Sequence, residues 1–170
     1  MSAESDLQRI YDEHAQALFA FLLNVTRDED DTRDLLQDVF VRLARQPDLL
    51  QSARNERCFL IRLAHNAVID AIRRRNARDK YHERFGAEEP PLFASAAAAD
   101  EQSFRMALSS ALGELPPEQR AVVHLKLWEG LTFEQIAEAL EIPMNTAASR
   151  YRYGIDKLRE RLRPLYDEIK

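Results

Sequence analysis

The sequence is poor in cysteine and glycine and contains no long apolar run. Its one cysteine, Cys58, cannot form an internal disulfide, and only four glycines in 170 residues argue against a turn-rich sheet protein. No stretch approaches the roughly 18 consecutive apolar residues that a membrane span needs. The N-terminus lacks the apolar run and small residues of an export signal. These absences favour a soluble, cytoplasmic protein, and the 45% of hydrophobic residues suffices for a helical core.

The net charge of -5 conceals two basic segments in an otherwise acidic chain. Residues 57–84 carry 8 basic and 3 acidic side chains, whereas residues 1–56 carry 6 basic and 12 acidic ones. Near the C-terminus, residues 145–163 hold six basic side chains against Asp156 and Glu160. The basic segments are therefore candidate nucleic-acid surfaces.

The first half has the apolar spacing of helices. Apolar residues recur at steps of three and four through residues 7–25, and "RDEDD" (27–31) then supplies carboxylates for the start of a second helix, which Pro47 ends. The segment 57–78 predicts a third helix, buried at its start and basic at its end. Residues 86–103 contain glycine, paired prolines and an alanine tract, which predicts a linker, although the alanines could extend the next helix.

The second half predicts four shorter helices. One runs from Phe104 to Leu115, and another starts at Pro117 and ends before Gly130. Thr132 and Gln135 fit a capping box that opens "FEQIAEAL". A last helix, capped by Asn145 or Thr146, is expected to reach about Arg163.

The last two helices fit a helix-turn-helix, which places its second helix in the DNA major groove. On that helix one side is apolar and predicted to pack: Ala147, Tyr151, Ile155, Leu158 and Leu162. The other side can meet DNA, since arginine binds phosphate or guanine and serine or asparagine can bond base edges. Its candidate residues are Asn145, Ser149, Arg150, Arg152, Tyr153 and Asp156. The simpler alternative is a solvated face of a terminal helix.

A second polar stripe follows the predicted helix 57–78. At 100° per residue it comprises Arg62, Asn66, Asp70, Arg73 and Arg74. Arginine can grip phosphates or stack on bases, while asparagine and aspartate could discriminate an unstacked base. Alternatively, Asp70 pairs along the helix with Arg73 or Arg74.

Three segments in order resemble the extracytoplasmic-function sigma factors, two-domain members of the bacterial sigma family. "DTRDLLQDVFVRLAR" is similar to their polymerase-binding helix, and "FLIRLAHNAVIDAIRRR" to their helix that melts and reads the minus-ten element. The C-terminal part, from "LPPEQRAVVHLKLWEG" through "SRYRYGIDKLR", resembles their domain that reads the minus-thirty-five element. The resemblance implies an all-α fold of two small domains, 1–85 and 104–170, joined by a flexible linker at 86–103, the second a helix-turn-helix.

The resemblance also implies partners and site residues. Core RNA polymerase and promoter DNA are the expected partners, and an anti-sigma factor is a further candidate. Residues expected to dock on the polymerase are Leu35, Gln37, Asp38 and Arg42. Those expected at the minus-ten strand are Arg62, Asn66, Asp70, Arg73 and Arg74. Those expected at the minus-thirty-five duplex are Asn145, Thr146, Ser149, Arg150, Arg152 and Tyr153.

The sequence departs from the family pattern at four positions. Glu141 replaces a usual turn glycine, Ala147 a usual β-branched residue and Ala148 a usual basic one. Phe59 stands where many members have tryptophan.

Other classes of function have less support in the sequence. An enzyme is disfavoured because the four histidines, His14, His65, His82 and His124, show no metal-ligand spacing with Cys58 and no glycine-rich phosphate loop is present. No catalytic residue, metal or cofactor is therefore expected. A helix-turn-helix regulator that acts without the polymerase would not need the basic stripe of the first half. A plain helical adaptor would leave both stripes merely solvated.

Overall fold

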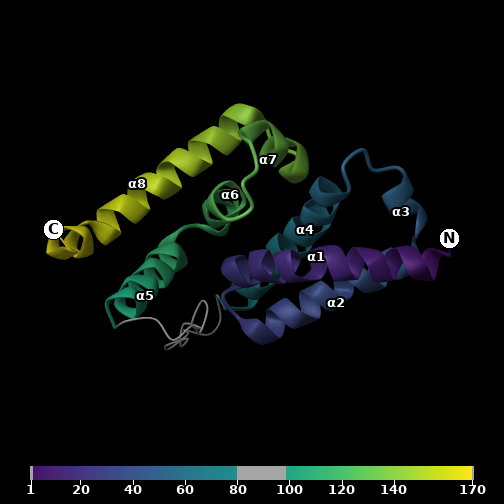
Figure 1. Cartoon of the computed structure of the whole chain (residues 1–170), viewed down its shortest axis with the longest axis horizontal. Helices are drawn as coiled ribbons and strands as arrows, with labels where there is room; N and C mark the ends of the chain where they lie inside the picture. Colours follow the sequence, from purple (N-terminus) through teal and green to yellow (C-terminus); the bar gives the residue numbers. More distant parts are fainter. Residues whose placement is uncertain (1, 80–98, 170) are drawn as a thin grey trace.

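The computed structural model describes residues 2–79 and 99–169, and it contains only helices and the turns between them in those ranges. The first half comprises α1 (Ala3–Thr26), α2 (Glu29–Arg45), α3 (Asp48–Gln51) and α4 (Glu56–Asp79). The second comprises α5 (Ala99–Glu114), α6 (Pro117–Leu127), α7 (Phe133–Leu140) and α8 (Met144–Ile169) (Figure 1). The all-α prediction is confirmed. None of these helices is both long and apolar enough to span a membrane.

Local capping sets where the helices of the first half begin. The Ser2 hydroxyl accepts a hydrogen bond from the Ser5 amide at 3.3 Å and caps α1, which ends where Arg27 adopts the left-handed conformation. The Asp28 carboxylate accepts from the Asp31 amide at 2.9 Å and caps α2. The acidic first turn of α2 faces the positive end of its helix dipole, as "RDEDD" predicted.

In the second half, the start and end of α6 and the cap of α7 also agree with the prediction. Pro117 occupies the first turn of α6, and Gly130, with a φ of 66°, lies just beyond that helix. Thr132 and Gln135 form the predicted capping box, with reciprocal bonds of 3.1 and 2.9 Å.

The structure adds one short helix and differs from the prediction at both ends of the last helix. The short helix α3 lies between α2 and α4, where no helix was predicted, and α5 begins at Ala99, as the alternative in which the alanines extend this helix allows. Residues 80–98 lie outside the described ranges. The last helix begins at Met144, because the Pro143 carbonyl accepts from the Ala147 amide, so neither predicted cap residue precedes it. It also continues through Pro164, beyond the predicted end.

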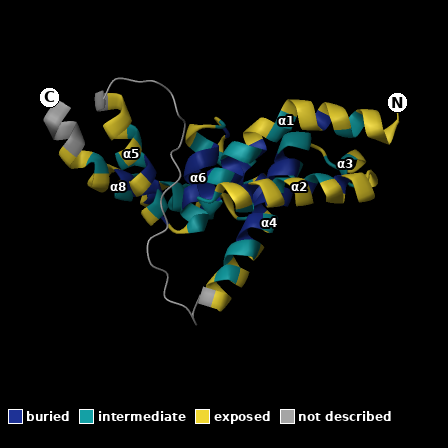
Figure 2. Cartoon of the chain, turned by 90° about the horizontal axis from the view of Figure 1, so that it is seen from below, coloured by how far each residue is buried: buried dark blue, intermediate teal, exposed yellow. Residues whose placement is uncertain are grey.

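A continuous apolar core joins the two halves. Leu22 and Val25 of α1 and Leu60 of α4 are fully buried in the same cluster as Val122 and Leu125 of α6. In Figure 1, α7 lies beside the start of α4, and Figure 2 shows buried α6 at the centre of the molecule. A smaller cluster packs α5 against α6 and α8 around Leu112, Leu115, Val123 and Leu158. The two halves thus form one closed body, which the sequence did not predict.

Candidate nucleic-acid interface

The helix-turn-helix is formed by α7 and α8. The turn closes with Glu141 in the left-handed conformation (φ 56°, ψ 46°), and the Ile142 amide donates to the Ala137 carbonyl at 3.1 Å. Ala147 is fully buried against α7, while Gly154 lets α8 approach α6 closely. A Cβ atom at Gly154 would lie 2.7 Å from Val123 Cγ2, so only glycine fits at this crossing without movement.

The side chains of α8 divide as the helical periodicity predicted. Ala147 and Leu158 are buried, and Tyr151, Ile155 and Leu162 are half-buried on the packed side. On the other side Asn145, Arg152, Tyr153 and Asp156 are exposed, and Thr146, Ser149 and Arg150 are half-buried. The guanidinium carbon of Arg152 lies 5.6 Å from the centre of the Tyr153 ring. The candidate contacts thus form one polar face at the N-terminal end of α8, while their roles remain predictions.

The predicted stripe on α4 is divided by the fold. Asn66, Asp70, Arg73 and Arg74 are exposed along the C-terminal part of α4. Arg62 instead points at the C-terminal end of α7, where its Nη2 donates to the Glu138 carbonyl at 2.7 Å. Its Nε lies 3.1 Å from Glu141 Oε1. The closed body therefore brings Arg62 together with the helix-turn-helix and leaves the other four residues of the stripe free of that contact.

The predicted polymerase-docking residues of α2 do not share one environment. Gln37, Asp38 and Arg42 are exposed, whereas Leu35 is only 9% exposed and belongs to the core. The Leu35 side chain therefore supports α2 from inside and is not on the docking surface of the closed body. A shallow apolar groove between α1 and α2, lined by Gln37 among others, also includes three residues that the sequence analysis missed: Tyr11, Phe40 and Val41. Tyr11 and Val41 are exposed apolar side chains, a signal that only the fold reveals.

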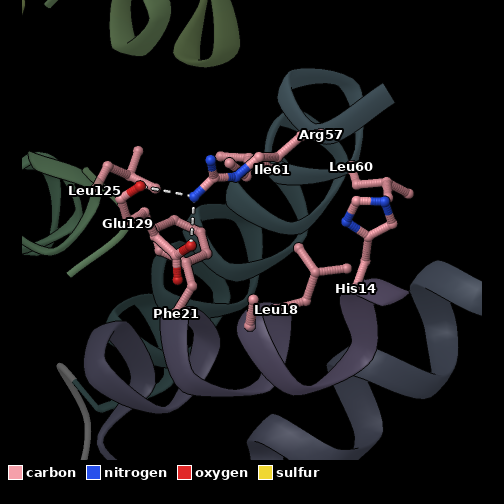
Figure 3. Close-up of a pocket in the computed structure, with 9 residues that line it drawn as sticks. His14, Leu18, Phe21, Arg57, Leu60, Ile61, Leu125 and Glu129 are labelled. Atoms are coloured by element: carbon pink, nitrogen blue, oxygen red, sulfur yellow. Dashed lines mark hydrogen bonds and ion pairs between the residues drawn. The ribbon is translucent and has the colours of Figure 1, made fainter. Parts of the chain in front are cut away.

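A chain of polar contacts crosses the junction between the halves. Arg57 of α4 donates through Nη2 to both the carbonyl and the carboxylate of Glu129, each at 2.7 Å (Figure 3). Glu129 Oε1 lies 3.6 Å from His124 Nε2, and His124 Nδ1 lies 2.9 Å from Asn24 Nδ2 of α1. The neighbouring His124 and Arg57 lower the pKa of Glu129 against the opposing effect of burial. Glu129 therefore stays ionised between Arg57 and His124.

Two further cationic side chains lie buried or partly buried near this junction. Arg120 of α6 donates to the Leu115 carbonyl at 2.9 Å and reaches the Val25 carbonyl of α1. Burial lowers the pKa of Arg120 to about 10, with nearby Arg27 adding to the effect. The Nη2 of Arg27 donates to the Ser109 hydroxyl at 2.9 Å. The second half is thus tied to both α1 and the turn that follows it.

Among the described residues, one acidic and histidine cluster has the spacing of a metal site. The ligand atoms of Glu13, His14 and Glu56 lie within 4.8 Å of one another, although the sequence separation concealed this. Arg9 already bridges the cluster, at 3.0 Å from Glu13 and 2.9 Å from Glu56. Its hydrogen bond is the main cause that lowers the pKa of Glu56. Arg9 therefore already holds both carboxylates and offsets part of their negative charge.

Comparisons with known proteins agree with this architecture. The family model Sigma-70 region 2 matches residues 10–78, and the model Sigma-70, region 4 matches residues 105–158. The two halves therefore define a protein of the sigma class.

Relatives narrow the class to one subfamily. The chain is 32% identical to the ECF RNA polymerase sigma factor SigL of Mycobacterium tuberculosis, covering 96% of this chain and 93% of that protein. It is also 32% identical to the RNA polymerase sigma factor CarQ of Myxococcus xanthus, over 98% and 95%. The sigma factor RpoE of Bartonella quintana, solved in complex with the anti-sigma factor NepR, shares the fold with a TM-score of 0.75. That match has 22% identity and covers 93% of this chain and 97% of that one.

The chain belongs to the extracytoplasmic-function (ECF) sigma factors. It is an alternative sigma factor, which directs RNA polymerase to promoters.

Proposed function

We propose that the two halves divide promoter recognition between them. Residues 1–85 dock on core RNA polymerase and open the minus-ten element, residues 104–170 read the minus-thirty-five duplex, and residues 86–103 join the two domains. The observation that carries this proposal is the presence of two separate polar faces. One is the exposed C-terminal part of α4, and the other is the N-terminal face of α8.

The α4 face suits single-stranded DNA. Arg73 and Arg74 can hold phosphates or stack on bases, while Asn66 and Asp70 offer hydrogen bonds to the edges of unpaired bases. Asp31 and Asp28 hold the neighbouring Arg75, with the closer contact at 2.9 Å, so that arginine instead fixes α4 against α2. The exposed arginines are therefore the better candidates for DNA contact.

The α8 face suits duplex DNA. Its first turns carry short polar side chains, with the half-buried Arg150 and the exposed Arg152 farther along. The short side chains can approach base edges while the arginines reach guanine or phosphate. We assign the minus-thirty-five contacts to this face, comprising Asn145, Thr146, Ser149, Arg150, Arg152 and Tyr153.

The outer face of α2 is our candidate for docking on the polymerase. Gln37, Asp38 and Arg42 are exposed there, next to the apolar groove between α1 and α2. An exposed apolar strip with a charged rim is typical of a protein–protein interface. Core polymerase supplies the chemistry of RNA synthesis, so we propose a cytoplasmic, non-enzymatic subunit without a cofactor. An anti-sigma factor is a candidate further partner, as NepR is for the Bartonella protein.

Transcription in vitro tests the proposal. Purified core polymerase is given a promoter library with and without the protein, and run-off products are sequenced. We expect a restricted set of promoters to be transcribed only when the protein is added. Sequence-specific, nanomolar binding of duplex DNA by the free protein, without dependence on core polymerase, would instead favour a regulator that acts alone.

A further inference from the structure

The last of three consecutive arginines in α4 differs from the other two. Arg73 and Arg74 are exposed, whereas Arg75 is half-buried against the start of α2. Its Nη1 donates to Asp31 Oδ2 at 2.9 Å, and its Nη2 lies 3.9 Å from Asp28 Oδ2. A run of arginines suggests equivalent contacts to phosphate, but two carboxylates already hold this one.

The two carboxylates belong to the turn between α1 and α2, which has its own hydrogen bonds. Asp28 Oδ1 accepts from the Asp31 amide at 2.9 Å, so the cap of α2 places one acidic residue beside the other. The Asp28 carbonyl accepts from the hydroxyls of Thr26 at 3.0 Å and of Thr32 at 2.7 Å, and Thr32 is fully buried. The acceptors of Arg75 are therefore held in place by bonds that do not involve α4.

The C-terminal end of α4 has little other support. Val68 is fully buried and Ile69 is 8% exposed, but among residues 73–78 every side chain except Arg75 is exposed. Figure 2 shows this part of α4 extending beyond the other helices. A helix end with few buried contacts opens locally at little cost in free energy. The contacts of Arg75 therefore have a large share in keeping this end in place.

The anchored side of α4 lies opposite the side that we assign to unpaired bases. At 100° per residue, Asn66 lies about 180° round the helix from Arg75, Arg73 about 160° and Asp70 about 140°. Contact with α2 thus holds the back of the helix and leaves the exposed polar stripe at its front free.

We propose that Arg75 is a positioning residue for strand opening, which seats the base-reading end of α4 on the α1–α2 turn through Asp31 and Asp28 and does not itself contact DNA. This inference rests on the function proposed above, because it concerns the step assigned to α4. Arg75 is 33% exposed, Asp31 45% and Asp28 40%, so the expected effects are small multiples.

Amide hydrogen exchange in the full chain tests the anchor without DNA or polymerase. Exchange at residues 73–78 is followed by mass spectrometry in the wild type, in Asp31→Ala and in Arg75→Gln. We expect both variants to exchange about two to five times faster there, as loss of a partly exposed ion pair allows. The double variant should exchange no faster than either single variant, because both changes remove the same contact.

Glu29→Ala is the matched control for Asp31→Ala. It also removes one carboxylate from the first turn of α2, but Glu29 pairs with Arg33 of the same helix. Exchange at residues 73–78 should therefore match that of the wild type. An equal increase in this control would overturn the anchor, and so would unchanged exchange in Asp31→Ala and Arg75→Gln.

Strand opening with core polymerase is the second measurement, on a promoter recovered in the transcription experiment above. We expect Asp31→Ala and Arg75→Gln to slow the appearance of permanganate-reactive thymines about two- to fivefold. A pre-melted promoter should remove this difference. Co-purification with core polymerase and the urea midpoint should stay near those of the wild type, whereas a general loss of structure would change both.

The sign of the Asp31→Ala effect separates positioning from direct contact with DNA. If Arg75 bound phosphate itself, loss of Asp31 would free that arginine and remove a nearby negative charge, so opening would be faster. Faster opening in Asp31→Ala, or slower opening in Arg75→Gln alone, would therefore overturn the proposal. If the wild type supports no transcription although Asp31→Ala speeds exchange, the proposed function fails, and the role in opening fails with it, whereas the anchor of α4 stands.

Discussion

Replacement of the buried Arg120 should destabilise the fold far more than replacement of an exposed arginine such as Arg159. Arg120 is only 6% exposed, and its Nη1 donates to the Leu115 carbonyl at 2.9 Å and to the Leu112 and Gly113 carbonyls at 3.4 Å each. Its Nη2 reaches the Val25 carbonyl in the other half. One guanidinium thus satisfies the carbonyls at the end of α5 and links α6 to α1.

Two opposing contributions set how much Arg120→Ala lowers the free energy of unfolding. Arg120→Ala leaves several buried carbonyls without a donor, at a cost of about 1–3 kcal/mol for each group that water cannot reach. It also removes a buried charge, whose desolvation is visible in the pKa of Arg120, lowered to about 10. Because the lost bonds share one side chain and partial relaxation is expected, we expect a net loss of about 3 kcal/mol in the free energy of unfolding.

Urea unfolding followed by far-ultraviolet circular dichroism measures this loss. Arg120→Met is the informative companion, because it retains volume but no donor and should also be destabilised. Arg159→Ala, at an exposed position of α8, is the control and should change stability by less than about 0.5 kcal/mol. If Arg120→Ala unfolds at the same urea concentration as the wild type, the carbonyls are not dependent on Arg120 and the reasoning is wrong.

Three other predictions concern pH, docking and DNA. Burial, with a contribution from Arg150, lowers the pKa of His65 to about 4. Below about pH 6.5 the unfolded chain therefore binds a proton at His65 that the folded chain does not bind, so the free energy of unfolding should be highest above that pH and fall by about 3 kcal/mol towards pH 4. The urea midpoint of His65→Leu should not show this dependence on pH. Asp38→Lys should reduce co-purification with core polymerase without loss of helix, whereas Glu101→Lys in α5 should leave co-purification unchanged. Equal binding of core polymerase by both variants would show that Asp38 is not on the docking surface. Arg73→Ala should impair strand opening, measured by permanganate reactivity, and a pre-melted promoter should restore its transcription. Arg150→Ala should weaken recognition of the duplex, and a pre-melted promoter should not restore its transcription. If both variants show the same defect on duplex and pre-melted promoters, the division between α4 and α8 is wrong.

Local features of the molecule were predictable because they depend on neighbours in the chain. The capping box at Thr132 and the acidic start of α2 involve residues three positions apart, and the structure has both. The two sides of α8 follow from helical periodicity alone, as the buried Ala147 and the exposed Arg152 show. The resemblance of three segments to the family could also be recognised from the sequence, because it depends only on the order of residues.

Contacts between distant residues were decided by the tertiary structure. Arg62 and Glu138 are 76 positions apart, and Asn24 and His124 are 100 apart, so no spacing rule links them. The stripe on α4 predicted that Arg62 would face DNA, but it could not show that α7 packs on the same face and takes up that arginine. Leu35 likewise has the spacing of a helix face, and only the packing of α2 on its neighbours makes that face internal. Sequence periodicity identifies which residues share a side of a helix, whereas the element that covers that side is chosen by the packing of the whole chain.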